Sequence, residues 1–272
     1  MSKTFDPAAI PVKPAATVIL VDDRPDLRVL MLRRTARVVF APDMWVFPGG
    51  RVDPEDHAGE LDSVITGLSD AEASRILGVE RGGLAWWLAA CRETLEESGL
   101  LLAHTAADDA IVSSLRDRVR EDESVFTELL VEAGIVLDAT AIEEVARFIT
   151  PEGSPRRFDA RFFVARAPAN QHPEHDDGEI VEWEWVAPHD ALARWSQGSF
   201  AMMSPTVRML ACLDRYADAD AVMRAARRRP PYRRVRVVDP EGEYRVVLPG
   251  EAGYATAELE IETGWVRLWG EA

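Results

Sequence analysis

The stretch 84–99 constrains the fold most, because its apolar and acidic residues can be separated from one another only on a helix. The apolar residues recur at intervals of three and four positions, which is the pattern of a helix with one buried stripe. They are Leu84, Trp87, Leu88, Cys91 and Leu95. Gly99 follows at a position where a helix commonly ends in a left-handed residue. The sequence therefore predicts a helix that is buried along one side and ends at Gly99.

Three glutamates crowd this helix beside one arginine. Glu93, Glu96 and Glu97 share one face of a single turn, with Cβ atoms about 5–6 Å apart. Two ionised carboxylates at ~5 Å repel by roughly 3 kcal/mol at an effective dielectric constant of about 20, so a cation should accompany them. Arg92 can offset part of the repulsion. Mg²⁺ could offset more, because it takes hard oxygen ligands such as carboxylates and substrate phosphates. A solvated acidic face and a metal site are both open interpretations.

A second feature lies upstream, where residues 45–50 read WVFPGG. This is an apolar strand that ends abruptly in Pro48, Gly49 and Gly50. Paired glycines allow a tight turn and let another group approach the backbone closely. The end of this strand is therefore a place where a ligand could contact the backbone.

The two segments resemble the two halves of the Nudix box. FPGG is similar to its first half, and RETLEESGL at 92–100 is similar to its second half, REUxEExGU with U aliphatic, from which only Thr94 departs. Gly50 precedes Arg92 by 42 positions, far more than in the usual box, so the segment 51–83 is an insertion. The glutamate that normally lies eight residues before the arginine is missing, since Leu84 occupies its position.

The interrupted box resembles one branch of the family, the acyl-CoA diphosphatase-like Nudix proteins. Residues 157–163, RFDARFF, are close to the RFDTRFF strand of that branch, and FITPE precedes them at 148–152. The resemblance covers roughly residues 14–210. It implies an α/β fold, the Nudix-type α/β/α sandwich with a mixed β-sheet, here with extra helices and C-terminal β-hairpins. It also implies metal-dependent hydrolysis of a nucleoside diphosphate linked to another moiety, which releases phosphomonoesters.

The resemblance assigns roles to residues of this chain. The expected metal ligands, for Mg²⁺ or Mn²⁺, are Glu93, Glu96, Glu97 and the carbonyl of Gly50. The expected catalytic residues are Arg92, which would hold the glutamates in place, Glu93, and a general base for which Glu179 and Glu182 are the candidates and Glu184 is next. The expected substrate-binding residues are Arg33, Arg34 and Arg51, for which a plain surface role is the alternative.

The substrate is defined less narrowly. Residues 31–35 and 47–53 only partly resemble the coenzyme A motif, and coenzyme A or acyl-CoA is the leading expectation. The first alternative is a pyrophosphatase that acts on ADP-ribose or NADH-type dinucleotides. The second is a non-catalytic Nudix module that senses a ligand, which the missing glutamate at Leu84 keeps open.

Charge and composition restrict the partners. The chain has 31 basic and 47 acidic residues and a net charge of −16, which argues against nucleic-acid and anionic-membrane binding because both need a basic face. It has no apolar run near the ~18 residues of a membrane span and no secretory segment at its N-terminus. Its two cysteines, Cys91 and Cys212, suit a reducing compartment. We therefore expect a cytoplasmic protein with a small-molecule partner.

We expect three regions along the chain: an N-terminal arm at 1–13, a Nudix domain at 14–216 with its insertion at 51–83, and a C-terminal extension at 217–272. Strands are expected at 15–21, 27–33, 143–150, 158–166 and 180–186, and helices at 69–77, 107–120, 123–133, 188–195 and 204–216. The extension is expected to form hairpins at 235–248 and 259–268. The acidic residues of the insertion, Asp56 among them, are interpreted as solvated surface.

Two further expectations concern the tail and the assembly. Seven arginines lie within 224–236, either as a solvated linker or as a phosphate clamp in which Arg227, Arg228 and Arg229 would bind the 3′-phosphate of coenzyme A. Trp86 lies off the apolar stripe of its helix and should be exposed. Together with the appended hairpins, this surface predicts a homodimer.

Overall fold

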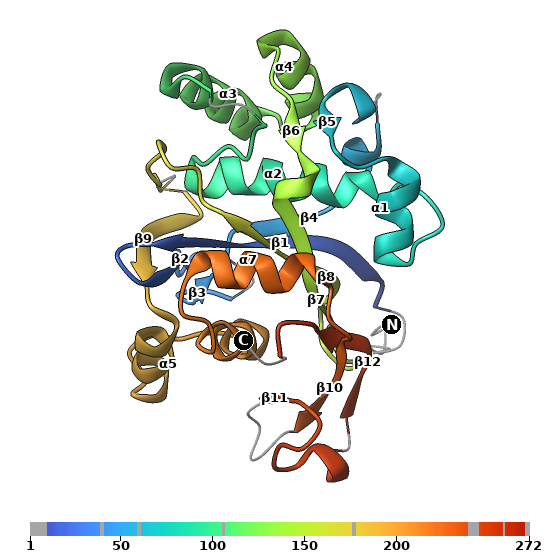
Figure 1. Cartoon of the computed structure of the whole chain (residues 1–272), viewed down its shortest axis with the longest axis vertical. Coiled ribbons are helices and arrows are strands. Elements are labelled where there is room, and N and C mark those ends of the chain that lie inside the picture. Colours follow the sequence, from blue (N-terminus) through green and yellow to red (C-terminus); the bar gives the residue numbers. More distant parts are fainter. Residues whose placement is uncertain are drawn as a thin grey trace, which may run out of the picture.

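The computed structural model describes residues 10–38, 41–58, 61–104, 107–175, 178–238, 245–257 and 259–269, without the side chains of 259–263. Its centre is one mixed sheet with helices on both faces (Figure 1). The strand order is β11-β10-β12-β7-β8-β1-β2-β3, and β4 and β9 pair with β1 and β2. The pair β1–β8 is parallel, and the other pairs in this sheet are antiparallel. The expected α/β/α sandwich is confirmed.

The strands of this sheet are β1 (Val12–Asp23), β2 (Leu27–Arg34), β3 (Trp45–Val46), β4 (Gly49–Arg51), β7 (Ile142–Ile149), β8 (Arg157–Arg166), β9 (Ile180–Val186), β10 (Arg233–Val238), β11 (Arg245–Val247) and β12 (Leu259–Val266). A separate pair consists of β5 (Ile65–Thr66) and β6 (Leu137–Asp138). The helices are α1 (Asp70–Leu77), α2 (Leu84–Ser98), α3 (Asp109–Glu121), α4 (Phe126–Ala133), α5 (Pro188–Ser196), α6 (Ser204–Leu213) and α7 (Ala219–Arg227). The strands and helices expected between residues 15 and 213 are present with small shifts at their ends.

The two faces of the sheet carry two hydrophobic cores because side chains alternate along each strand. On β1, Val18 and Leu20 belong to the core under α1–α4, whereas Ile19 and Val21 belong to the core under α5–α7. Figure 1 shows these two groups of helices above and below the sheet. A side chain on either face is therefore separated from the other face by the sheet itself.

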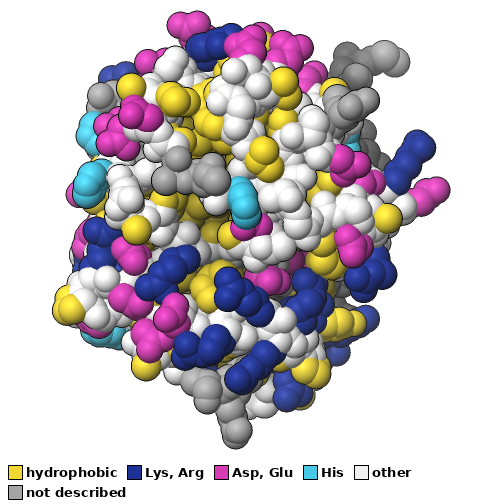
Figure 2. Space-filling model, turned by 45° about the horizontal axis from the view of Figure 1, so that its top comes forward, with side chains coloured by type: hydrophobic (Ala, Val, Ile, Leu, Met, Phe, Trp, Pro, Cys, Tyr) yellow, Lys and Arg dark blue, Asp and Glu magenta, His cyan; other side chains and the backbone are white. Residues whose placement is uncertain are grey.

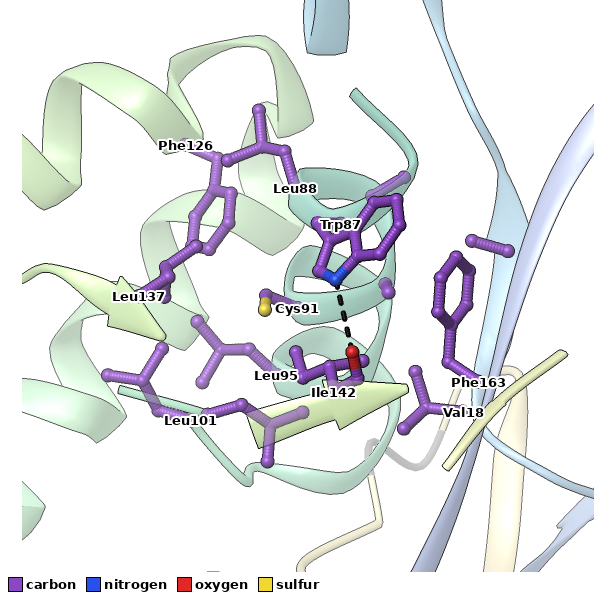
Figure 3. Close-up of a cluster of buried hydrophobic side chains, with 14 of the residues drawn as sticks. Val18, Trp87, Leu88, Cys91, Leu95, Leu101, Phe126, Leu137, Ile142 and Phe163 are labelled. Atoms are coloured by element: carbon purple, nitrogen blue, oxygen red, sulfur yellow. Dashed lines mark hydrogen bonds between the residues drawn. The ribbon is translucent and has the colours of Figure 1, made fainter. Parts of the chain in front are cut away.

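Helix α2 is the central element of the first core. Figure 3 shows Leu88, Cys91 and Leu95 turned toward α4, β6 and Leu101, while Trp87 packs against Phe163 of β8. The indole nitrogen of Trp87 donates a hydrogen bond to the carbonyl of Ile142 at 3.2 Å, so this large side chain is buried without losing its polar contact. The helix ends as expected, with Gly99 in the left-handed region at φ 72°.

The insertion covers the outer side of α2. It forms the short 3₁₀ helix η2 (Pro54–His57) and helix α1, which begins at the capping box between Ser69 and Glu72. As a result Trp86 is only 8% exposed, and its ring packs edge-on against His57 at 5.8 Å between centroids. The expectation that Trp86 is exposed was wrong, which removes that argument for a homodimer.

The C-terminal region completes the same sheet. The hairpin of β10 and β11 is confirmed, although its turn at 239–242 lies outside the described residues. The second expected hairpin was wrong: β12 is one strand that pairs with both β10 and β7, with a register shift opposite Arg234 and Arg236. Helix α7 was not predicted. Of the expected N-terminal arm, residues 1–9 lie outside the described part, and β1 already begins at Val12.

The tail arginines lie on the far face from α2. Helix α7 packs on β7 and β8 through the second core, and both Arg227 at its end and Arg228 after it are exposed. Figure 2 shows that Lys and Arg side chains gather on the lower half of the face it draws. Arg229 lies 3.6 Å from the buried carboxylate of Glu144. Within one chain, the tail is therefore not placed to clamp a ligand held by α2. None of the described helices has the length and apolar character needed to cross a bilayer.

Candidate active site

The acidic face of α2 meets the Gly49–Gly50 turn at the start of β4. The backbone N–H of Gly49 donates a hydrogen bond to Oε2 of Glu97 at 2.9 Å. At Gly50, a Cβ atom would overlap the carboxylate of Glu93, so only glycine allows this approach. The two segments that the sequence singled out are therefore in direct contact, although they are more than forty positions apart.

Arg92 lies buried among the glutamates, with 1% of its surface exposed. Its Nη1 atom donates hydrogen bonds to Glu93 at 3.0 Å and to Glu96 at 3.1 Å, and it also reaches Glu123 at 3.3 Å. Its Nη2 atom donates to the carbonyl of Arg51 at 3.1 Å. Arg92 is therefore positioned to hold two of the three glutamates and to tie α2 to β4.

Asp56 is the residue that the sequence analysis missed. Its carboxylate accepts two hydrogen bonds from Arg92, at 3.0 Å to Nε and 2.8 Å to Nη2, and only 4% of its surface is exposed. The expectation that it is solvated surface was wrong, because η2 turns it inward toward the guanidinium. The spacing of Asp53 and Asp56 around Pro54, which forms a capping box, was the available signal. The insertion thus brings a carboxylate to a box that lacks one at Leu84.

Arg34 and Glu179 join the cluster from the opposite side. Arg34 Nη1 lies 3.5 Å from Oε1 of Glu97, and its Nη2 donates to Glu179 at 2.8 Å. The side chain of Glu179 remains 61% exposed. One predicted substrate-binding residue and one predicted general base are therefore brought to the glutamates.

Arg33 and Glu182 are not brought to this cluster. Arg33 pairs with Asp43 at 2.7 Å and with Glu182 at 3.1 Å, and Glu184 pairs with Arg194 of α5 at 2.7 Å. On β2, Leu32 belongs to the core under α2 and Met31 to the core on the other face. The same alternation directs Arg33 and its partner Glu182 away from α2 and places Arg34 on the α2 side, the side of Leu32.

Arg51 lies at the edge of the cluster. Its side chain is half exposed and contacts Asp53 at 3.2 Å, while its carbonyl accepts the hydrogen bond from Arg92. The guanidinium of Arg51 makes no contact with the glutamates among the described ion pairs.

The electrostatics of the cluster favour an added cation. Burial raises the pKa of Glu97 to about 8, although Arg34 and the Gly49 N–H act in the opposite direction. Burial raises the pKa of Glu96 to about 7 against the charge of Arg92, and it also raises the pKa of Glu93. The two arginines therefore do not fully compensate the three carboxylates.

The carboxylates of the three glutamates suit a hard metal ion, but in this structure they do not point toward one common position. Among the described residues, no three His, Cys, Asp or Glu side chains surround one point closely enough to hold an ion. Arg92 holds Glu93 and Glu96, while Gly49 and Arg34 hold Glu97. Carboxylate oxygens are the ligands that Mg²⁺ and Mn²⁺ prefer, so the chemistry of these side chains fits such an ion.

Comparison with known proteins gives a consistent result. The family model described as the NUDT19 Nudix domain matches residues 68–213. Acyl-coenzyme A diphosphatase NUDT19 from Xenopus laevis is 26% identical, over 71% of this chain and 61% of that protein. The protein of the same name from Homo sapiens is 28% identical, over 60% of this chain and 54% of that protein. The chain spans 54 to 62% of the length of the curated relatives it matches.

One solved structure is similar over most of its length. The crystal structure of a NUDIX hydrolase from Alicyclobacillus acidocaldarius has 25% sequence identity and a TM-score of 0.65, and the match covers 79% of this chain and 97% of that chain. The sandwich fold of this chain is therefore similar to a fold already seen in a crystal structure.

Proposed function

Because the chain belongs to the Nudix hydrolase family, in the branch of the NUDT19 Nudix domain, we propose that it hydrolyses a nucleoside diphosphate linked to another moiety. The observation that carries this proposal is the meeting of Glu93, Glu96 and Glu97 with the Gly49–Gly50 turn around the buried Arg92. Coenzyme A or an acyl-CoA is the substrate we propose, which the names of the relatives from Xenopus laevis and Homo sapiens support.

The metal site that we propose consists of Glu96 and Glu97, with Glu93 and the carbonyl of Gly50 as further ligands. A divalent ion such as Mg²⁺ or Mn²⁺, when bound, would neutralise phosphate oxygens and lower the pKa of a bound water. Three partly uncompensated carboxylates with raised pKa values support a cation at this position.

The remaining residues orient the reactants. Hydrolysis adds the oxygen of water to one phosphorus atom, and the bridging oxygen leaves with the other phosphate, so that two phosphomonoesters form. Glu179 is the general base we propose for the proton of water, since it is exposed and hydrogen-bonded to Arg34 beside Glu97. Arg34 is the cation nearest to both carboxylates and would face the substrate phosphate. Arg92 and Asp56 position the glutamates without contacting the substrate.

A substrate screen tests the proposal. Coenzyme A, acetyl-CoA, ADP-ribose and NADH would each be incubated with Mg²⁺ or Mn²⁺, and released phosphomonoester would be measured, with EDTA as the control. We expect turnover of coenzyme A or its thioester only when a metal is present. Preferential turnover of ADP-ribose or NADH would support the proposed hydrolase activity but contradict coenzyme A as its substrate. An absence of turnover on all four compounds would favour a ligand-sensing module.

The homodimer and the cytoplasmic location remain predictions. Light scattering at micromolar concentration tests the homodimer, and a mass of 30.2 kDa, that of one chain, would contradict it. Localisation of the tagged full-length protein tests the expected cytoplasmic compartment.

A further inference from the structure

A basic cavity of about 410 Å³ is lined in part by Arg51, the residue that follows Gly50. Four of the residues that line it are cationic, namely Lys13, Arg51, Arg156 and Arg157, and the others are apolar or proline, including Phe158. Of the residues that the structure describes, no aspartate or glutamate lines it. The chain as a whole has a net charge of −16. This cavity is therefore a local positive site on a negatively charged protein.

Within the part of the chain that the structure describes, most of this charge has no carboxylate partner. Among the described residues, no carboxylate forms an ion pair with Lys13, Arg156 or Arg157, and only Arg51 has one, with Asp53 at 3.2 Å. Arg157 is 8% exposed, and its Nε donates a hydrogen bond to the carbonyl of Thr150 at 3.0 Å. No described residue accepts a hydrogen bond from its two terminal nitrogens, which could therefore bind an acceptor of a ligand. Arginine is seldom this buried unless it is paired, and a guanidinium fork binds phosphate oxygens in a bidentate manner.

The strands that line the cavity also lead to the proposed site. The first strand residues of β1 and β8 are register partners, Val12 with Arg157, and β4 pairs with β1 so that Arg51 lies opposite Ala15. Arg51 directly follows Gly50, which touches Glu93, and consecutive Cα atoms are ~3.8 Å apart. One molecule could therefore reach from the carboxylates past Arg51 into the cavity.

The side chains that line the cavity indicate which kind of ligand it binds. A diphosphate that must be held with a metal belongs at the carboxylates, whereas a cavity with no acidic residue can hold an anion without a metal. A phosphomonoester carries close to two negative charges at neutral pH, which suits four cations. Pockets of 300–1,000 Å³ take groups well above the size of phosphate, and the ring of Phe158 offers an apolar wall for a nucleoside.

We propose that this cavity binds the phosphorylated nucleoside end of the substrate, with its phosphomonoester on Lys13, Arg156, Arg157 and Arg51. The proposal rests on the proposed function in that it takes the substrate to be a nucleoside diphosphate. It narrows the substrate to one that carries a second phosphate on its nucleoside, apart from the diphosphate that is cleaved. It also moves the phosphate-recognition site from the tail arginines to the near end of β1 and β8.

Calorimetric titration in EDTA, without turnover, tests the cavity. The full-length protein would be titrated with adenosine 3′,5′-bisphosphate, with AMP and with inorganic phosphate. We expect the bisphosphate to bind at least tenfold tighter than AMP or inorganic phosphate. The double variant Lys13→Gln/Arg156→Gln, at two exposed positions, should reduce the preference over AMP to less than twofold. Arg227→Gln/Arg228→Gln removes the same charge from exposed positions on α7 and should leave the preference unchanged.

The outcomes separate this proposal from the proposed function. Equal binding of bisphosphate and AMP by the wild type, or an undiminished preference in Lys13→Gln/Arg156→Gln, would overturn the cavity assignment even if diphosphates are hydrolysed. Inorganic phosphate that binds as tightly as the bisphosphate would also overturn it, because the cavity would then not recognise a substrate. A preference lost only in the cavity variant would support it even if the substrate screen shows no hydrolysis.

Discussion

Arg92 carries its charge where water cannot solvate it, and its neighbours explain why it remains charged. Burial alone would lower its pKa, but the hydrogen bonds that it donates to Asp56 and the charges of Glu93, Asp56 and Glu96 raise it. A buried charge is tolerated only when its hydrogen-bonding capacity is filled, and removal of one partner leaves an uncompensated ion. The site therefore depends on Asp56 for its stability as much as on the glutamates for its chemistry.

The first residue-scale prediction concerns Asp56. Asp56→Ala should lower the free energy of unfolding by about 3 kcal/mol, the lower end of the range for breaking a buried ion pair, because Glu93 and Glu96 still contact Arg92. Urea unfolding measures the loss, and Glu55→Ala is the matched control because Glu55 is an exposed neighbour in the same 3₁₀ helix. If both variants unfold at the same urea concentration, Asp56 does not hold Arg92.

The second concerns Glu97. Glu97→Gln keeps an oxygen that can accept the hydrogen bond from Gly49 and removes only the charge, so the variant should remain folded. We expect kcat on the substrate identified by the screen to fall at least ~100-fold, about 2.7 kcal/mol, because a proposed metal ligand is lost. Glu184→Gln, on the opposite face and paired with Arg194, is the control. A folded Glu97→Gln variant with wild-type turnover at saturating Mg²⁺ would rule out the metal assignment.

At the scale of elements, local patterns gave the positions of α1, α2 and the strands of the core, because each is encoded by its own periodicity and capping residues. The contacts between elements were less accessible. Asp56 is buried by an arginine thirty-six positions away, and local sequence indicates only a charged residue. Trp86 is buried by the insertion in the same way. The sequence at 262–264 favours a turn, but the chain continues through these residues as one strand, β12, which pairs with β10 both before and after them.

In the site, too, local features could be predicted from the sequence, whereas contacts between elements could not. The motif identified the glutamates, Arg92 and Gly50, which do lie together, because spacing on one helix and a glycine turn are local properties. It did not separate Arg34 from Arg33, since adjacent residues of β2 point to opposite faces of the sheet and the motif does not say which face α2 covers. Glu182 was misplaced for the same reason. The basic cavity was missed because its cations come from β1, β4 and β8.

The glycine turn gives a prediction at this scale. A Cβ at Gly49 would overlap the backbone of Ala16 and Thr17 in β1, whereas a Cβ at Gly50 would overlap the movable carboxylate of Glu93. Gly49→Ala should therefore lower the free energy of unfolding by about 1–3 kcal/mol. Gly50→Ala should change stability less but lower kcat at least ~10-fold, or about 1.4 kcal/mol, by displacing Glu93. Thermal unfolding and kcat of both variants check this, and the opposite pattern would contradict it.

At the scale of the whole molecule, the sheet separates the charged cluster on one face from a purely structural core on the other. The α2 face holds the charged cluster and its supports, while the other face is a second apolar core closed by α5–α7 and by the C-terminal strands. Because β7 takes hydrogen bonds from β12, the C-terminal strands extend the sheet that also carries β1 and β8. The cavity at the near end of those two strands therefore depends on a sheet to which residues far along the chain contribute.

The last prediction tests whether residues 217–272 are separable. Five of the hydrophobic side chains that this region buries are Val235, Val237, Val246, Val266 and Leu268. At about 1.5–3 kcal/mol for each, their loss would cost roughly 8–15 kcal/mol, which is comparable to the ~5–15 kcal/mol total stability of a typical protein. A chain that ends at Tyr216 should therefore lose its cooperative transition in calorimetry and its near-ultraviolet circular dichroism. A chain that ends at Trp269 is the control and should unfold like the full protein. If the shorter chain unfolds as cooperatively and at the same temperature as the full protein, the boundary expected at residue 217 is real, and the C-terminal strands are an appendage rather than part of the core.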